Sequence, residues 1–221
     1  MNRRNFLRLA GGVTASSLLP GGGVSLGTES GMKPWRSYVT ACLDTLIERG
    51  TDRYGPVKTP MLMAILDVRT HKSPEQPPLL DADVRTEGRP GHGRRSPGGS
   101  NLWHDMATVR VLYRASEVTG DAQYAEAADA YLEAFLKRSV KPNGMLAWGS
   151  HIYYNAFTDR PGGDGDGGGP HEILIKHPDW GSLYRVDPAA VRKEIDGIWK
   201  WHVVDKQTGL HNRHDDGHKG C

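Results

Sequence analysis

The fold is decided by residues 100–138, which read SNLWHDMATVRVLYRASEVTGDAQYAEAADAYLEAFLKR. Apolar side chains recur every three or four positions on both sides of Gly120, which is the spacing of two amphipathic helices. Ser100 is a preferred residue for capping the first helix, Gly120 suits its end, and Asp121 can cap the second. This stretch therefore predicts two antiparallel helices joined by a short turn.

Two more helices are expected, one on each side of this hairpin. Residues 35–49 place their apolar side chains on one helical face, with Pro34 in the first turn and Gly50 at the end. Another helix should begin near Pro188 and carry a second apolar face. The apolar segment 62–68 is too short to decide between a strand and a helix.

Helical hairpins separated by long polar loops favour one fold class. The sequence predicts an all-α fold, an α/α toroid built of helical hairpins, in which the loops at one end supply the site. A closed toroid needs more hairpins than 221 residues provide, so we expect the toroid to be incomplete in this chain. Residues 215–221 follow the most informative motifs without a closing element, so we also expect truncation at the C-terminus.

The charge of the chain is nearly balanced. The formal net charge is +2, and the basic residues are scattered apart from an arginine-rich loop within residues 74–99, which excludes nucleic acid as an expected partner. That loop is either a solvent-exposed segment without a binding role or a basic edge of the site that attracts a polyanion. Cys42 and Cys221 are given no function, and Cys42 is expected to be a buried thiol.

The N-terminus has the features of a targeting signal. Arg3 and Arg4 precede Phe6, and residues 9–19 form a weakly apolar stretch that is too short to span a bilayer. The pattern resembles a twin-arginine (Tat) signal, which implies export by the Tat machinery to the periplasm or beyond, without stable membrane insertion after processing. We therefore divide the chain into a Tat-type signal and linker, 1–30, and a main domain, 31–221. The alternative is a basic tail without a targeting role.

Residues 148–214 gather the side chains best suited to metal and proton chemistry. His151, Glu172 and His214 lie in segments between or beyond the expected helices, where a site at one end of a toroid would be assembled. Two neutral imidazoles and one carboxylate suit manganese, nickel, cobalt or zinc, whereas calcium prefers oxygen ligands. With ten histidines in the chain, however, spacing alone leaves a structural role for these residues open.

Three neighbouring features are open to two interpretations. His171 suits either the orientation of a metal ligand or a surface position. Trp148 suits a sugar platform or, as we expect, a core position. The Gly-rich run 161–170 is expected to be a flexible linker, although its Asp164-Gly165-Asp166 looks superficially like a calcium loop. His104 and His211 are regarded as background.

Six short motifs occur together along the chain. They are Asp52-Arg53-Tyr54-Gly55-Pro56, Ser100-Asn101-Leu102, Thr119-Gly120-Asp121, Trp148-Gly149-Ser150-His151, His171-Glu172 and Arg213-His214. Their order and approximate intervals resemble pectate lyases of polysaccharide lyase family two, over about residues 45–216. The resemblance implies an α/α barrel longer than this chain, which cleaves polygalacturonate by β-elimination with a transition metal.

The resemblance also implies a role for each site residue. The metal ligands would be His151, Glu172 and His214, with manganese the first choice, and the Brønsted base would be Arg213. From the residues alone, a clamp for a substrate carboxylate is the preferred role of Arg213. The expected partner is an acidic polysaccharide or oligogalacturonate. The alternatives are a glycoside hydrolase on a similar toroid and a non-catalytic periplasmic glycan-binding protein.

Overall fold

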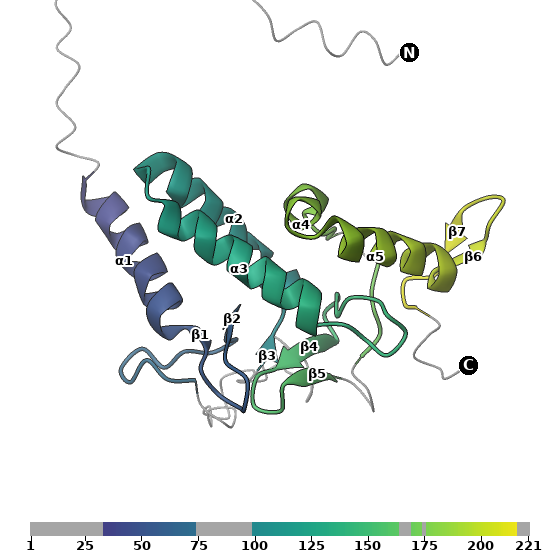
Figure 1. Ribbon diagram of the computed structural model, residues 1–221, viewed down its shortest axis with the longest axis horizontal. Coiled ribbons are helices and arrows are strands. Elements are labelled where there is room, and N and C mark those ends of the chain that lie inside the picture. Colours follow the sequence, from purple (N-terminus) through teal and green to yellow (C-terminus); the bar gives the residue numbers. More distant parts are fainter. Residues whose placement is uncertain (1–32, 74–98, 164–168, 174–175, 216–221) are drawn as a thin grey trace, which may run out of the picture. The chain divides into compact units, whose positions relative to one another are not determined.

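The structure is a computed structural model that describes residues 33–73, 99–163, 169–173 and 176–215 (Figure 1). The expected signal 1–30, most of the arginine-rich segment, residues 164–168 and Cys221 lie outside the described residues. The chain divides into two units, Met1–Arg36 and Ser37–Cys221, and the core and the candidate site belong to the second.

Helices supply the larger part of the described structure. They are α1 (Lys33–Arg49), α2 (Leu102–Thr119), α3 (Ala122–Arg138), α4 (Trp180–Val186) and α5 (Pro188–Trp201). All of the expected helices are confirmed, and α4 was not predicted because its seven residues contain only one buried side chain, Leu183. Among the described residues, no helix combines the length and the apolar character needed to cross a membrane.

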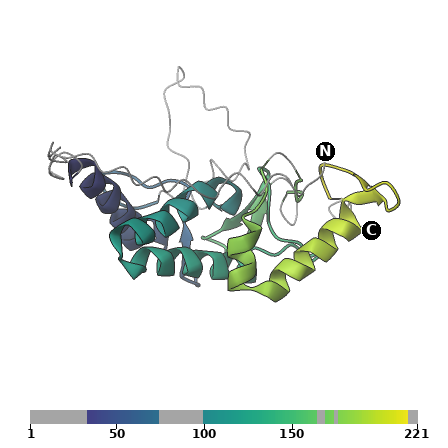
Figure 2. The same cartoon turned by 90° about the horizontal axis from the view of Figure 1, so that it is seen from above.

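The predicted hairpin of α2 and α3 is confirmed, and both views show the two helices side by side (Figures 1 and 2). Gly120 ends α2 in the left-handed region at φ 77°, and Asp121 caps α3 through the backbone N–H of Gln123. The cap of α2 is Asn101, one residue later than expected. Ser100 is not available as the cap because it belongs to a strand and pairs with Tyr154.

The expectation of an all-α toroid is wrong. Of the described residues, 48% are helical and 17% are strand, and the strands form three small antiparallel sheets. The sheets are β1 (Thr51–Asp52) with β2 (Thr59–Leu62), β3 (Gly99–Ser100) with β4 (Ile152–Asn155) and β5 (Arg160–Gly163), and β6 (Val203–Asp205) with β7 (Leu210–His211). Strands of two to four residues are too short to display an alternating pattern, so the sequence presents them as loops.

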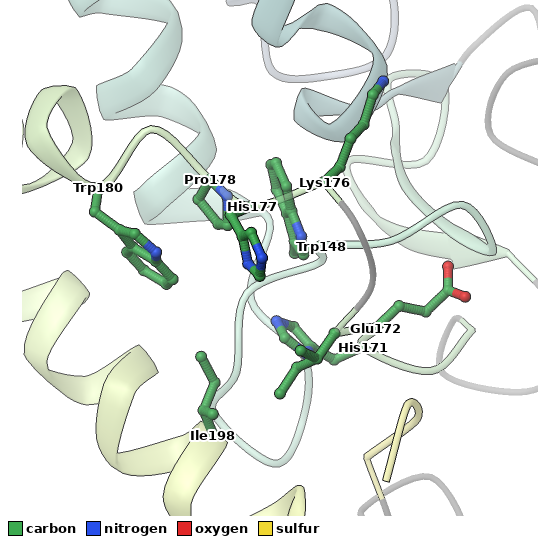
Figure 3. Close-up of a pocket in the computed structure, with 9 residues that line it drawn as sticks. Trp148, His171, Glu172, Lys176, His177, Pro178, Trp180 and Ile198 are labelled. Atoms are coloured by element: carbon green, nitrogen blue, oxygen red, sulfur yellow. The ribbon is translucent and has the colours of Figure 1, made fainter. Parts of the chain in front are cut away.

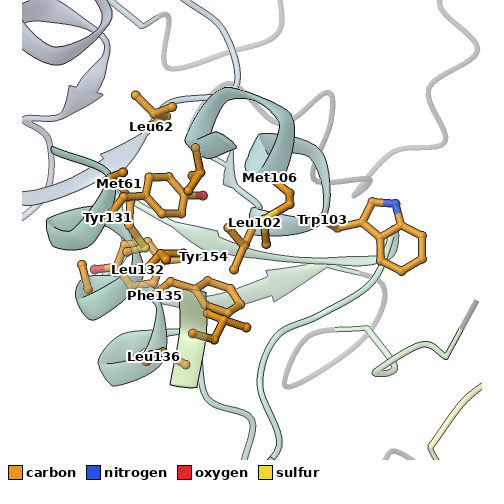
Figure 4. Packing of buried hydrophobic residues seen from close by; sticks show 14 of the residues in the cluster. Met61, Leu62, Leu102, Trp103, Met106, Tyr131, Leu132, Phe135, Leu136 and Tyr154 are labelled. Carbon is orange, nitrogen blue, oxygen red and sulfur yellow. The ribbon is translucent and has the colours of Figure 1, made fainter. Parts of the chain in front are cut away.

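The core lies between the hairpin and the strands β2 and β4 (Figure 4). Its fully buried side chains include Leu102, Leu132, Phe135 and Tyr154. Burial of a large apolar side chain stabilises a fold by about 1.5–3 kcal/mol, so this cluster fixes where β4 and the residues just before it lie. The apolar face of α1 is buried only in part. Cys42 is exposed, so the expectation of a buried thiol is wrong.

Candidate metal centre

Two short segments lie side by side beneath the site. Glu172 and His214 face each other in an antiparallel bridge, the N–H of Ile173 donates to Arg213 O at 2.8 Å, and the N–H of Asp215 donates to His171 O at 3.1 Å. Side chains alternate across such a pair, so Glu172 and His214 point to one side while His171 and Asp215 point to the other. Figure 3 shows the side chains of His171 and Glu172 leaving the chain in opposite directions.

The structure brings His151, Glu172 and His214 together as one cluster. Glu172 Oε1 lies 3.3 Å from His214 Nε2 and 3.7 Å from His151 Nε2. The two imidazole rings meet edge to face, with 5.9 Å between their centroids. One ligand atom from each residue lies within 4.8 Å of the other two, which is compact enough for one ion to contact all three. We call these residues the open trio.

The carboxylate of Glu172 is fully buried and is held at both oxygens. Oε2 accepts hydrogen bonds from the backbone N–H and the hydroxyl of Ser150, and Oε1 accepts from Arg213 Nε at 3.0 Å and Nη2 at 2.7 Å. Burial alone would raise the pKa of Glu172, but the bonds from Ser150 and Arg213 and the nearby His151 outweigh it and lower the pKa to about 2. Glu172 is therefore ionised at neutral pH.

Gly149 allows the loop before His151 to pass close to this carboxylate. Its φ is 148°, and a Cβ at this position would lie 2.9 Å from Glu172 Oε2 and 3.0 Å from Cγ. Any other residue would push Glu172 away from Ser150. Sequence reasoning did not assign Ser150 to the site, although its place beside His151 in the Trp148-Gly149-Ser150-His151 motif was a usable signal.

A second polar cluster lies on the other side of the segment pair. His171 Nδ1 lies 2.8 Å from His202 Nε2, and His171 Nε2 lies 2.6 Å from Glu194 Oε1. These three side chains are at most 2% exposed, and we call them the inner trio. Beside it, Lys141 forms a buried ion pair of 2.7 Å with Asp215, which also accepts from the N–H of His171. A surface position for His171 is thus wrong.

An apolar hollow of about 180 Å³ lies on the side of His171 and is lined in part by Trp148, Trp180 and Ile198 (Figure 3). Trp148 is 2% exposed and packs on Trp103 with 5.2 Å between ring centroids, which confirms its expected core position. The carboxylate of Glu172 points away from the hollow in Figure 3. His211 is exposed on β7, apart from the cluster, as expected of a background residue.

An ionised, buried carboxylate between two imidazoles and an arginine defines the class of a candidate metal-binding centre on a mixed helical and strand scaffold. A profile of the family described as periplasmic pectate lyase matches residues 92–220. The chain belongs to this family. It is 27% identical over 186 residues to a pectate disaccharide-lyase of Dickeya dadantii (strain 3937), an alignment that covers 82% of this chain and 31% of that protein. The chain thus spans less than a third of the length of this curated relative.

Proposed function

We propose that this chain carries the site of a metal-dependent pectate lyase that cleaves polygalacturonate or a related polyuronate by β-elimination. The observation that supports this most is the approach of His151, His214 and Arg213 to one buried oxygen, Glu172 Oε1, in a chain of the pectate lyase family. The relative from Dickeya dadantii is named for lyase action on pectate, and we extend the pectate substrate class to this chain.

The open trio suits a divalent transition metal. Two imidazole nitrogens and one ionised carboxylate favour manganese, nickel, cobalt or zinc over calcium, and we propose manganese first. Such an ion, when bound, would draw charge from the uronate carboxylate and make the neighbouring carbon more acidic. Ser150 occupies Oε2 of Glu172, which leaves Oε1 as the oxygen turned toward both imidazoles.

Arg213 is the proposed base. Its side chain is 51% exposed, so it can reach a substrate, yet Glu172 fixes its guanidinium beside the trio. An arginine accepts a proton only in its neutral form. The pair with ionised Glu172 favours the charged form, so the positive charge of a bound ion and the exclusion of water by substrate would have to offset it. Arg213 would then remove the proton from the carbon next to the uronate carboxylate. A double bond forms to the adjacent carbon, whose bond to the glycosidic oxygen breaks, and the electron pair leaves with that oxygen.

The charge state of Glu172 excludes one of the two roles that a glycoside hydrolase would give to a carboxyl group. Most glycosidases need one carboxyl group that stays protonated near neutral pH and gives its proton to the leaving oxygen. The pKa of Glu172 is lowered to about 2, so this group cannot serve as that acid. The alternative of a non-catalytic glycan-binding protein is decided by the experiment below.

The same proposal includes location and organisation. The family is described as periplasmic, which agrees with export. We propose that residues 1–30 act as a Tat-type signal read by the Tat machinery, and that residues 31–221 contribute the lyase part of the protein. Its partner would be an acidic polysaccharide or oligogalacturonate.

The test is the absorbance of the unsaturated uronate product. Protein stripped with a chelator is given polygalacturonate with manganese, with calcium or with no metal, and we expect product to return with manganese. Arg213→Ala should lower kcat by about 10²–10⁴-fold, which is the usual contribution of a general base. Arg192→Ala, which removes an exposed arginine on α5, is the matched control and should act like the wild type.

Two outcomes contradict this proposal. Saturated products would indicate a hydrolase. Binding of oligogalacturonate by folded, manganese-loaded protein without any product would indicate a glycan-binding role.

A further inference from the structure

The loop that carries His151 is held at both ends by one side chain. The amide Nδ2 of Asn101 donates to Gly149 O at 3.0 Å and to Ile152 O at 2.9 Å. Ser150 and His151 are the two residues between these carbonyls, and both of their side chains approach Glu172. Asn101 therefore holds the loop by hydrogen bonds on both sides of Ser150 and His151.

Both amide hydrogens and the side-chain oxygen of Asn101 are hydrogen-bonded within the protein. Its side-chain oxygen accepts the backbone N–H of Trp103 at 2.9 Å and so caps α2, while both amide hydrogens are used on the loop. The residue is 3% exposed, so each of these bonds is shielded from water. The two roles use different atoms: the oxygen caps the helix, and the nitrogen holds the loop.

Two glycines pack closely against the backbone of the same loop. A Cβ at Gly163 or at Gly169 would overlap the carbonyl oxygen of His151. Both glycines lie within the run 161–170 that we expected to be a flexible linker, and their lack of side chains lets the backbone pack against His151. The position of His151 is thus set by contacts to its backbone, and Asn101 supplies the hydrogen-bonded part of them.

We propose that Asn101 is a positioning residue that holds Ser150 and His151 in place for the open trio. This inference rests on the proposed function in that it names the trio as metal ligands. Hydrogen bonds that orient ligands commonly change metal affinity by about 10–100-fold when they are lost. The rival explanation is that Asn101 acts only as a helix cap.

Asn101→Ser separates these explanations. Serine is as good a cap as asparagine, but it has no amide to donate to the two carbonyls. The control is Asp121→Ala, which removes the cap of α3 and leaves the loop untouched. We expect the dissociation constant for Mn²⁺, measured by titration calorimetry on the full chain, to rise about 10–100-fold in Asn101→Ser and to stay unchanged in Asp121→Ala.

A second measurement needs no metal. In chelator-treated protein, amide hydrogen exchange at residues 149–152 should be faster in Asn101→Ser than in the wild type and in Asp121→Ala. Wild-type affinity together with wild-type exchange in Asn101→Ser would overturn the proposal, as would equal losses of affinity in both variants. If the wild type takes up no Mn²⁺, the metal assignment fails by itself, and unchanged exchange in Asn101→Ser would still overturn the positioning role.

Discussion

Two sets of two histidines and one glutamate lie on opposite sides of the same segment pair. The open trio and the inner trio have the same chemical composition, and they are His151, His214 and Glu172 on one side and His171, His202 and Glu194 on the other. Because Glu172 directly follows His171, one peptide bond separates the two environments. Since the residue types are identical, the two trios differ only in how their side chains are arranged and exposed.

The inner trio is arranged as a line. The carbonyl of Asn212 can only accept, so His202 Nδ1, at 2.9 Å, carries the hydrogen, and His202 Nε2 accepts from His171 Nδ1. Burial, the largest influence, lowers the pKa of His202, in agreement with a neutral ring. The far nitrogen of His171 meets Glu194 at 2.6 Å. Three of the four imidazole nitrogens in this line are hydrogen-bonded within the protein, and the fourth, His171 Nε2, lies close to Glu194 Oε1 without hydrogen-bond geometry.

The open trio converges instead. Both imidazoles turn Nε2 toward the same oxygen of Glu172, at 3.3 and 3.7 Å, and His214 is 40% exposed. Composition therefore does not distinguish a ligand set from a structural hydrogen-bond line. Convergence on one oxygen, with access from solvent, is the feature on which we base the proposal that the open trio is a ligand set.

The largest effect should come from the ion pair beside the inner trio. Burial would raise the pKa of Asp215, but Lys141, together with bonds from His171 and Asn143, lowers it, so the carboxylate is charged. Lys141→Met leaves that charge buried without its partner, and we expect the free energy of unfolding to fall by about 3–5 kcal/mol in urea denaturation. Lys193→Met, at an exposed position on α5, should stay within about 0.5 kcal/mol. Equal free energies of unfolding for the two variants would show that the ion pair of Lys141 and Asp215 does not stabilise the fold.

The next effect concerns the charge of the open trio without metal. The pKa of Glu172 is about 2 in the fold against an ordinary 4.5, so ionisation stabilises the folded chain above about pH 4.5 and this contribution is lost as the pH falls toward 2. The shift corresponds to about 3 kcal/mol. In the presence of a chelator, the difference in unfolding free energy between wild type and Glu172→Gln should shrink as the pH is lowered from about 5. A constant difference would contradict the proposed charge state.

The helical hairpin and the open trio were within reach of the sequence. The apolar spacing of residues 102–138 repeats over several turns, and the positions of His151, Glu172 and His214 followed from motif order. The sheets were not predictable, because pairs such as Gly99↔Asn155 join residues far apart through strands of two to four residues. Without these pairings the sequence indicates loops in place of strands, and its prediction of an all-α fold is therefore wrong.

The inner trio was also missed, for a different reason. Glu194 lies on α5 and His202 caps its C-terminal end, and polar residues at such positions are ordinarily solvated. Nothing in their spacing along the sequence shows that they contact His171. In the sequence, Asn101 stands out only as part of the motif Ser100-Asn101-Leu102. Its role depends on two carbonyl groups about fifty positions away, at Gly149 and Ile152, which sequence alone does not place beside it.

The sharpest test of the comparison replaces one histidine of each trio by alanine and compares the two variants. His202→Ala leaves His171 Nδ1 and the carbonyl oxygen of Asn212 without their side-chain partner. We therefore expect a loss of about 2 kcal/mol in the free energy of unfolding of the metal-free protein and little change in the affinity for Mn²⁺. His151→Ala should do the reverse, with a hundredfold weaker affinity and a smaller loss of stability, because its ring contributes to the open trio. If both variants lost stability and affinity in the same proportion, the two trios would be one cooperative unit, and convergence on Glu172 would no longer separate a ligand set from a structural one.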